Sequence, residues 1–234
     1  MKRPWKEDLK QAFEAPEPLR KEEFLQRFAK SSMSGFEFVR IQLMYIRKWI
    51  WVLSAGIFMV SLTAAACLKA DMVWVISALT PILALTIISE SGRSQTYEMA
   101  ELEMATQFSL KSVILARLGI VGIENVVLLC LMVPIGILNS VVSPLQAGLY
   151  IVVPFLLTTF CGLYAVRRFR GREASYICTG IACIVSFSMI FCHGNLPEIY
   201  EETYVIWWIA AVIILGTETG KQCYKMINRM EELA

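Results

Sequence analysis

The stretch SESGRSQTYEMAELEMATQFSLKS, from Ser89 to Ser112, decides how the rest of the chain is arranged. It is the one long polar segment that lies between two strongly apolar runs, and each of these runs is long enough to cross a bilayer. Its middle, YEMAELEM from Tyr97 to Met104, consists of good helix formers and contains no Gly or Pro. We therefore expect a short helix here, outside the membrane. A helix held between two spans could transmit the movement of a bound protein to both of them.

The overall composition is typical of a membrane protein. Of the 234 residues 56% are hydrophobic, and the mean hydropathy of +0.56 excludes an ordinary soluble domain. The seven cysteines form no CxxC pair, and most lie in apolar runs, where small buried side chains are the favoured interpretation. A single histidine, His193 next to Cys192, cannot complete a metal site. We expect no metal and no cofactor in this chain.

Six apolar segments are candidates for crossing a bilayer core about 30 Å thick. They are residues 49–68, 72–89, 113–138, 145–166, 176–191 and 204–217. The last is the shortest and would need a tilted neighbour or a thinned bilayer. Because a lipid-facing backbone must satisfy its own hydrogen bonds, the sequence predicts an all-α membrane protein with six transmembrane helices.

The distribution of positive charge predicts the orientation of these spans. With the N-terminus in the cytoplasm, 21 of the 22 Lys and Arg residues fall on the inner side or beside it, and Lys69 alone falls outside. Positive charge collects on the cytoplasmic side of membrane proteins. We therefore expect both termini to be cytoplasmic and the protein to be a multi-pass protein of the plasma membrane.

The residues before the first span predict an interfacial helix. Ser34 and Glu37 form a capping box that opens an amphipathic helix reaching Lys48, with basic and aromatic residues on it. Its alternative is a water-soluble helix packed on the N-terminal segment. The predicted organisation is a cytoplasmic arm with the interfacial helix (1–48), a transmembrane domain (49–217, with the cytoplasmic helix at 90–109) and a cytoplasmic tail (218–234).

Glu124 and Asn125 lie about halfway along the third predicted span. An ionisable group at that depth is costly unless it faces protein or water. Arg117 shares the helical face but lies about 10 Å away, too far for direct pairing. Glu124 and Asn125 could form a polar point on a translocation path or a contact with a partner subunit. Equally, Glu124 could be protonated or hydrogen-bonded to a neighbouring span, with Asn125 assisting.

The carboxylates Glu98, Glu101 and Glu103 make the predicted cytoplasmic helix acidic. They could be simply a solvated face, or they could meet basic residues of a cytoplasmic partner and pass its movement into two spans. Glu90 and Arg93 are spaced as an (i, i+3) pair at the start of the segment.

The string GTETGKQ, Gly216 to Gln222, is not a phosphate-binding loop. It has three residues between its glycines where four are needed, and Gln222 stands where Ser or Thr would hold magnesium. Gly216 and Gly220 are better interpreted as a small-xxx-small surface for close helix approach.

With its six spans, an amphipathic helix over Ser34–Lys48 and YEMAELEM between spans two and three, the chain resembles the ABC-2 type transporter permeases. The resemblance covers the whole chain by layout and depends on weak motifs. It implies that residues 90–109 form a coupling helix that docks on a separate ATPase. The candidate contacts with that ATPase are Arg93, Tyr97, Glu98, Glu101 and Glu103.

The resemblance further implies a permease without catalysis of its own, in an ATP-driven exporter whose ATP and Mg sit on the ATPase. A second permease copy, or a homologous permease, would complete the pathway, and no nucleic acid is involved. The family often has re-entrant outer helices before its last span, and residues 193–202 are barely long enough for one. Two alternatives remain: a membrane-anchored sensor whose arm, Met1 to Met33, binds a cytoplasmic partner, and a substrate-binding membrane subunit of an importer.

Overall fold

The computed structural model describes residues 35–67, 73–91, 110–137, 142–169, 172–195, 200 and 202–232. In these ranges the chain forms seven α-helices and one short 3-10 helix, and no strand. The chain divides after Val39 into two units, and the packing given below is that of the second unit, which begins at Arg40.

The helices follow one another with short connections. In chain order they are α3 (Gly35–Tyr45), α4 (Lys48–Cys67), α5 (Val73–Ser91), α8 (Leu110–Ile137), α9 (Pro144–Arg168), α10 (Arg172–Asn195), the 3-10 helix η2 (Glu202–Tyr204) and α11 (Val205–Glu232). The start of α9 shows why the sequence breaks where it does. Ser143 caps the helix in a capping box with Gln146, and Pro144 occupies the first turn, where its missing N–H costs nothing.

Five of the helices, α4, α5, α8, α9 and α10, are long and apolar enough to cross a membrane, so the structure supports an integral membrane protein. They coincide closely with the first five predicted spans. The sixth predicted span corresponds to the beginning of α11. There the continuous apolar run ends at Leu215, and the helix continues past Glu218 and Lys221 to Glu232, so a sixth crossing stays a prediction.

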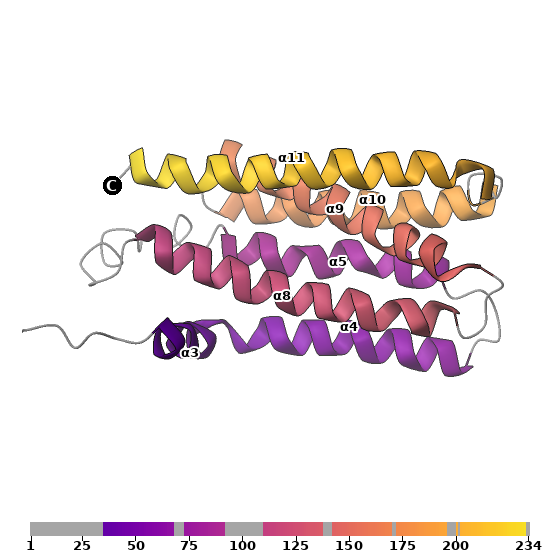
Figure 1. Ribbon diagram of the computed structural model, residues 1–234, viewed down its shortest axis with the longest axis horizontal. Helices are drawn as coiled ribbons and strands as arrows, with labels where there is room; N and C mark the ends of the chain where they lie inside the picture. The colour runs from indigo at the N-terminus through magenta and orange to yellow at the C-terminus, as the bar shows by residue number, and fades with distance from the viewer. Residues whose placement is uncertain are drawn as a thin grey trace, which may run out of the picture. The chain divides into compact units, whose positions relative to one another are not determined.

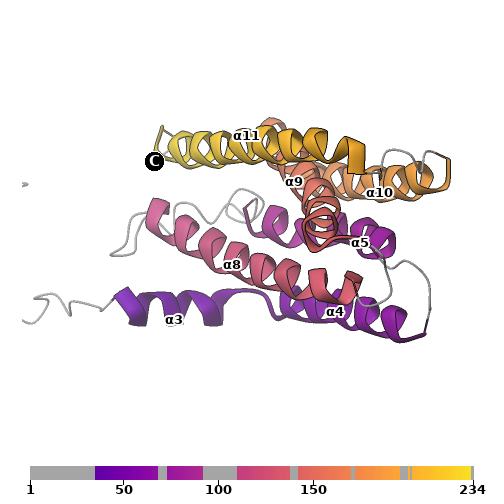
Figure 2. The ribbon, with the colours of Figure 1, turned by 45° about the vertical axis from the view of Figure 1, so that its right-hand side comes forward.

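Within the second unit the helices pack in layers, as two views show (Figure 1, Figure 2). Helices α5 and α9 pack most extensively on each other. Helices α4 and α8 pack against α5 on one side, and α10 and α11 lie on the other. Helix α5 therefore contacts α4, α8, α9 and α10, and it is the central helix of the bundle.

The sequence of α5 explains its central position. Apolar and small residues cover its whole circumference, and a helix without a polar face is stable only when neighbours surround it. Its small polar side chains donate hydrogen bonds to carbonyl oxygens of the same helix. The Thr80 hydroxyl donates to Ser77 O at 2.9 Å, and the Ser91 hydroxyl donates to Ile88 O at 2.8 Å. The hydroxyl of Ser77 instead donates to Tyr150 O of α9 at 2.7 Å, which joins the two most extensively packed helices.

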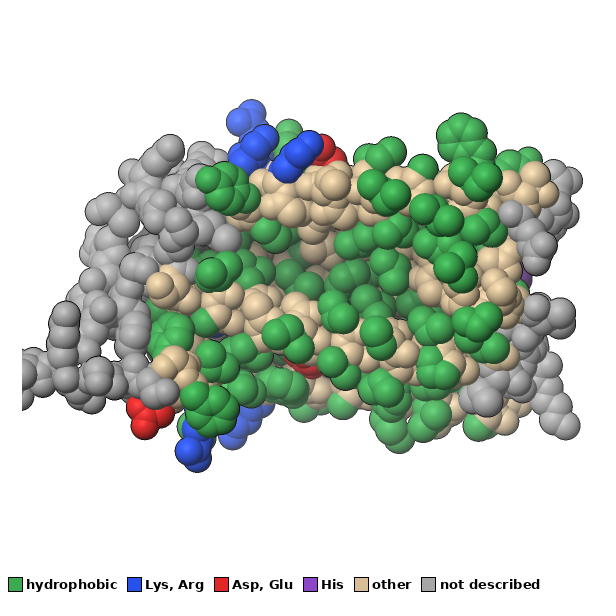
Figure 3. Space-filling model, viewed as in Figure 1, with side chains coloured by type: hydrophobic (Ala, Val, Ile, Leu, Met, Phe, Trp, Pro, Cys, Tyr) green, Lys and Arg blue, Asp and Glu red, His purple; other side chains and the backbone are tan. Residues whose placement is uncertain are grey.

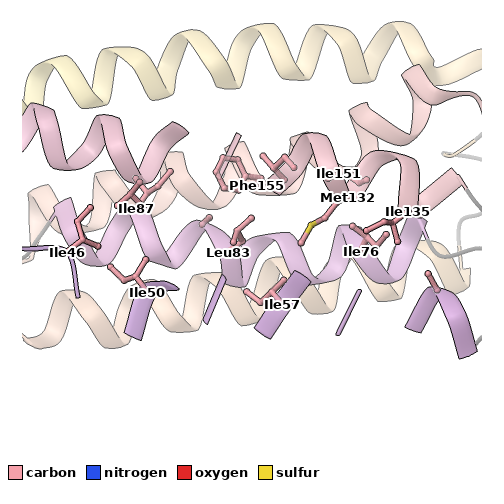
Figure 4. Packing of buried hydrophobic residues seen from close by; sticks show 14 residues of the cluster. Ile46, Ile50, Ile57, Ile76, Leu83, Ile87, Met132, Ile135, Ile151 and Phe155 are labelled. Carbon is pink, nitrogen blue, oxygen red and sulfur yellow. The ribbon is translucent and has the colours of Figure 1, made fainter. Parts of the chain in front are cut away.

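The main hydrophobic cluster lies where α4, α5, α8 and α9 meet. Its side chains come from all four helices, and Figure 4 labels ten of them, among them Ile57, Leu83, Met132 and Phe155. Burial of such side chains contributes roughly 1.5–3 kcal/mol each in water, but between membrane helices packing takes over the role of the hydrophobic effect. Shape complementarity along α5 therefore determines how tightly the layers hold together.

Helices α5 and α9 approach each other closely at Gly162 of α9. A Cβ atom built there would overlap Ile88 Cδ1 and lie 2.8 Å from Ile88 Cγ1, so only glycine fits against this isoleucine of α5. The predicted close approach at Gly216 and Gly220 is not seen. A Cβ at either position would meet no atom within 4 Å in the part of the chain that the structure describes.

Candidate functional site

The predicted coupling-helix residues lie outside the described part of the chain. Arg93, Tyr97, Glu98, Glu101 and Glu103 fall between Ser91, where α5 ends, and Leu110, where α8 begins. The structure describes the two helices that flank this segment, α5 before it and α8 after it. Helix α5 also includes Glu90, whose side chain is buried, whereas the sequence suggested that this residue stands outside the span.

Asn125 of α8 joins α8 to the central helix. Its side chain is completely buried, and its Nδ2 donates a 2.9 Å hydrogen bond to Thr86 Oγ1. The Thr86 hydroxyl in turn donates to Leu83 O at 2.7 Å. The predicted polar residue thus makes a helix-to-helix contact within the chain, with neighbours that satisfy both groups.

Glu124, the neighbour of Asn125, faces α4. Its carboxyl interacts with Ser54, a residue that is only 2% exposed. Neither Ser54 Oγ nor Glu124 Oε2 has any other hydrogen-bond partner among the described residues, and both oxygen atoms are buried. The structure thus separates the two adjacent polar residues: Asn125 is bonded to Thr86 of α5, and the Glu124 carboxyl contacts Ser54 of α4.

Arg117 has partners of its own near the start of α8. Its Nε donates to Gln42 Oε1 at 3.2 Å, and its guanidinium carbon lies 5.1 Å from the centre of the Tyr45 ring. A cation over an aromatic face is stabilised by the ring quadrupole. The predicted separation of about 10 Å along the helix keeps Arg117 from pairing with Glu124. Gln42 and Tyr45 instead hold this arginine against the end of α3.

A second buried polar contact joins α9 and α11 at the same end. The Nη1 of Arg167 donates to Gln222 Oε1, and Gln222 is buried. One turn farther along α11, Met226 packs with Ile114 of α8 and Leu163 of α9. This contact could not be predicted from the sequence, because the two residues lie 55 positions apart and the predicted boundaries place Arg167 after the span 145–166 and Gln222 in the tail 218–234. In the structure both lie within helices.

The opposite end of the bundle carries an aromatic cluster that sequence reasoning also missed. It consists of Trp74, Tyr150, His193, Tyr200 and Trp208, which come from α5, α9, α10, the residue before η2, and α11. Trp74 and His193 stack with centroids 5.1 Å apart. Tyr150 packs edge-on against both Tyr200 and Trp208 at 5.0 Å. The cluster ties together the ends of four helices.

This cluster bears on the outer gate that the permease resemblance raised. Helix α10 ends at Asn195 and η2 begins at Glu202. Residues 196–199 and 201, which lie between them, are outside the described part of the chain, so a re-entrant outer element stays a prediction. Tyr200 in this connection contacts Tyr150 through its ring and through its carbonyl oxygen.

The charged surface is divided along the bundle. On the face shown in Figure 3, Lys and Arg side chains gather toward the end where α11 finishes, and hydrophobic side chains are spread along the rest of the described surface, with other side chains and backbone between them. In the described ranges, no three His, Cys, Asp or Glu side chains come together in a way that could hold a metal ion.

No family model, no curated protein and no solved structure matches this chain. The resemblance to the ABC-2 type permeases therefore remains an interpretation of the sequence layout.

Proposed function

We propose that this protein is the permease subunit of an ATP-driven transporter of the ABC type, an exporter in which a partner ATPase supplies the energy. The chain would cross the membrane six times, with α11 as the sixth span and both termini in the cytoplasm. It carries no nucleotide site in this proposal. Its role is to convert movement of the ATPase into a change of access across the membrane.

The position of α5 supports this proposal most directly. The acidic segment that would contact the ATPase follows α5 and precedes α8. Helix α5 itself packs against α4, α8, α9 and α10. A displacement of its inner end would therefore reach four other helices at once. A helix at the edge of the bundle would pass on much less.

The distribution of charge supports the orientation. Arg40 precedes the first span and Lys48 begins it, Arg168 ends α9, and Lys221 and Lys225 lie in the last part of α11. In a chain that crosses back and forth, these positions share one side of the membrane, as the positive-inside rule requires of a cytoplasmic face.

Co-purification tests the proposal. A tagged full-length chain should bring down an ATPase, and Glu98→Lys with Glu101→Lys should remove it, because reversing two charges replaces attraction by repulsion. The matched control reverses two exposed carboxylates on other helices, Glu173→Lys with Glu218→Lys, and should keep the complex. If the first pair of reversals leaves the ATPase bound while the chain stays folded, residues 90–109 are not the coupling helix.

A deletion separates the proposal from a membrane-anchored sensor. Removing Met1 to Met33 should leave the ATPase bound and its hydrolysis coupled if the coupling segment lies between α5 and α8. In a sensor that uses its N-terminal arm as the docking site, the same deletion abolishes partner binding.

A further inference from the structure

Two prolines interrupt the backbone hydrogen bonding of the two most extensively packed helices. Pro81 lies inside α5, and Pro154 lies inside α9. Proline has no N–H, so the carbonyl oxygen four residues earlier in the helix loses its usual donor. The oxygens freed in this way are those of Ser77 in α5 and Tyr150 in α9. A helix that lacks such a bond bends most easily at that point.

One serine connects the two interruptions. The carbonyl oxygen of Ser77, which Pro81 frees, accepts a hydrogen bond from Thr80 Oγ1 at 2.9 Å. The hydroxyl of the same serine donates at 2.7 Å to Tyr150 O, the oxygen that Pro154 frees. Hydroxyl side chains and neighbouring helices commonly satisfy the carbonyl groups that prolines free in membrane helices. The breaks in α5 and α9 are therefore joined directly through Ser77.

The hydrophobic packing changes at the same level of the bundle. Val73 of α5 forms a separate cluster with Ala147 and Tyr150 of α9. On these two helices the main hydrophobic cluster starts at Ile76 and Ile151, next to the freed carbonyl oxygens, and Figure 4 shows both isoleucines toward one end of it. The two breaks thus lie at the boundary between two packed clusters.

The residues beyond this boundary are tied to one another by aromatic contacts. Trp74 stacks on His193 of α10, and Tyr150 packs against Tyr200 and Trp208. These contacts join the first turns of α5 and α9 to the end of α10 and the start of α11. This end of the bundle can therefore move as one piece when α5 and α9 bend.

We propose that Pro81 and Pro154 form a coupled pair of hinges and that the Ser77 hydroxyl is the link between them. The first turns of α5 (73–77) and α9 (144–150) tilt together against the remainder of the bundle. The inference rests on the proposed function only for the meaning of this movement, which would open the extracellular side of the pathway. The movement itself belongs to the chain alone and needs no ATPase, so this inference and the coupling proposal can fail independently.

Hydrogen exchange of the full-length chain in detergent, read by peptide mass spectrometry, tests the link. Ser77→Ala removes the donor and should speed exchange of residues 144–153 about fivefold, which corresponds to about 1 kcal/mol of local opening free energy. Exchange of residues 155–168 should not change, because only the part of α9 before the hinge loses its link. Ser61→Ala is the matched control and should exchange as the wild type does. The Ser61 hydroxyl is equally buried, but it donates to a carbonyl oxygen of its own helix, α4.

A second substitution tests whether the link acts on the oxygen that the proline frees. Pro154→Ala restores an N–H, so Tyr150 O regains a donor within α9. In the Ser77→Ala chain this change should return exchange of residues 144–153 to about the wild-type rate. Faster exchange along the whole of α9, unchanged exchange, or no restoration by Pro154→Ala overturns the proposal. If the double variant fails to fold, equal exchange of residues 144–153 in Ser77→Ala and Ser61→Ala overturns it, and faster exchange in Ser77→Ala alone supports it.

Discussion

The hydroxyl of Tyr150 donates a 2.8 Å hydrogen bond to the carbonyl oxygen of Tyr200, and the two rings pack edge to face with their centroids 5.0 Å apart. Tyr150 lies near the start of α9, and Tyr200 lies in the connection between α10 and α11. The backbone of Tyr150 also accepts the hydroxyl of Ser77 from α5. One residue thus fixes the end of the central helix and the connection that leads into α11.

Tyr150→Phe should lower the stability of the folded protein. The substitution keeps the ring and removes the hydroxyl, so the carbonyl oxygen of Tyr200 loses its side-chain donor. A hydrogen bond of this kind contributes about 0.5–1.5 kcal/mol net. We expect a lower melting temperature in detergent. Tyr204→Phe, at an exposed tyrosine of η2, is the control and should melt as the wild type does. An unchanged melting temperature for Tyr150→Phe would show that the ring contacts alone hold this connection.

The same cluster predicts a loss of stability at alkaline pH. Burial of the phenol raises the pKa of Tyr200 to about 12, and the neighbouring Cys192 and Tyr150 add to the rise. The unfolded chain releases this proton near pH 10, where the folded chain still holds it. The contribution of Tyr200 to stability is therefore complete below pH 10 and is lost as the pH rises toward 12. Melting curves over this range should fall less steeply for Tyr200→Phe than for Tyr204→Phe.

Gly162→Ala should destabilise the contact between α5 and α9. Its Cβ would overlap the side chain of Ile88, a buried branched residue that has little room to move, and overpacking of this kind costs about 1–3 kcal/mol. Ile88→Ala in the same chain should restore much of the lost stability by making room. Gly180→Ala on α10, where a Cβ meets nothing within 4 Å, is the matched control. Failure of Ile88→Ala to rescue would show that the cost does not come from this overlap.

The apolar runs predicted five of the helices to within a few residues. The predicted span 49–68 is α4 (Lys48–Cys67), and the predicted span 145–166 lies within α9 (Pro144–Arg168). This succeeds because bilayer thickness and backbone hydrogen bonding together fix the length of an apolar helix. The end of α11 was not predictable in the same way. The continuous apolar run ends at Leu215, but the helix continues to Glu232, and Met226 in this last part packs on α8 and α9.

The contacts of the candidate sites depended on three-dimensional packing. The sequence singled out Glu124 and Asn125 from their depth in a span, but it could not assign Asn125 to Thr86 and Glu124 to Ser54. Adjacent residues on a helix point about 100° apart, so they meet different neighbours. The aromatic cluster was invisible for a related reason. Its five residues are spread from position 74 to position 208, and no local pattern joins them.

The hydrogen bond between Asn125 and Thr86 should show a measurable coupling in a double-mutant cycle. The cycle combines Asn125→Leu with Thr86→Val and is read from stability in detergent. Hydrogen bonds between membrane helices average about 0.6 kcal/mol and reach about 1.7 kcal/mol. Because Asn125 is completely buried, we expect a value in the upper half of that range. A cycle of Asn125→Leu with Thr63→Val, an exposed threonine of α4, should show no coupling. No coupling between Asn125 and Thr86 would remove this bond as a link between α5 and α8.

The last part of α11 should contribute to the stability of the bundle. Met226 is 1% exposed and packs with Ile114 and Leu163, so Met226→Ala leaves a cavity and should cost about 2–5 kcal/mol, whereas Tyr224→Ala, at an exposed residue of the same turn, should cost far less. Thermal unfolding of the full-length variants measures the difference. Truncation after Thr217 should be as damaging as Met226→Ala or worse, because it also removes Gln222 from Arg167. If the truncated chain is as stable as the wild type, the C-terminal residues are a tail without a structural role, and α11 is held in place by its apolar part alone.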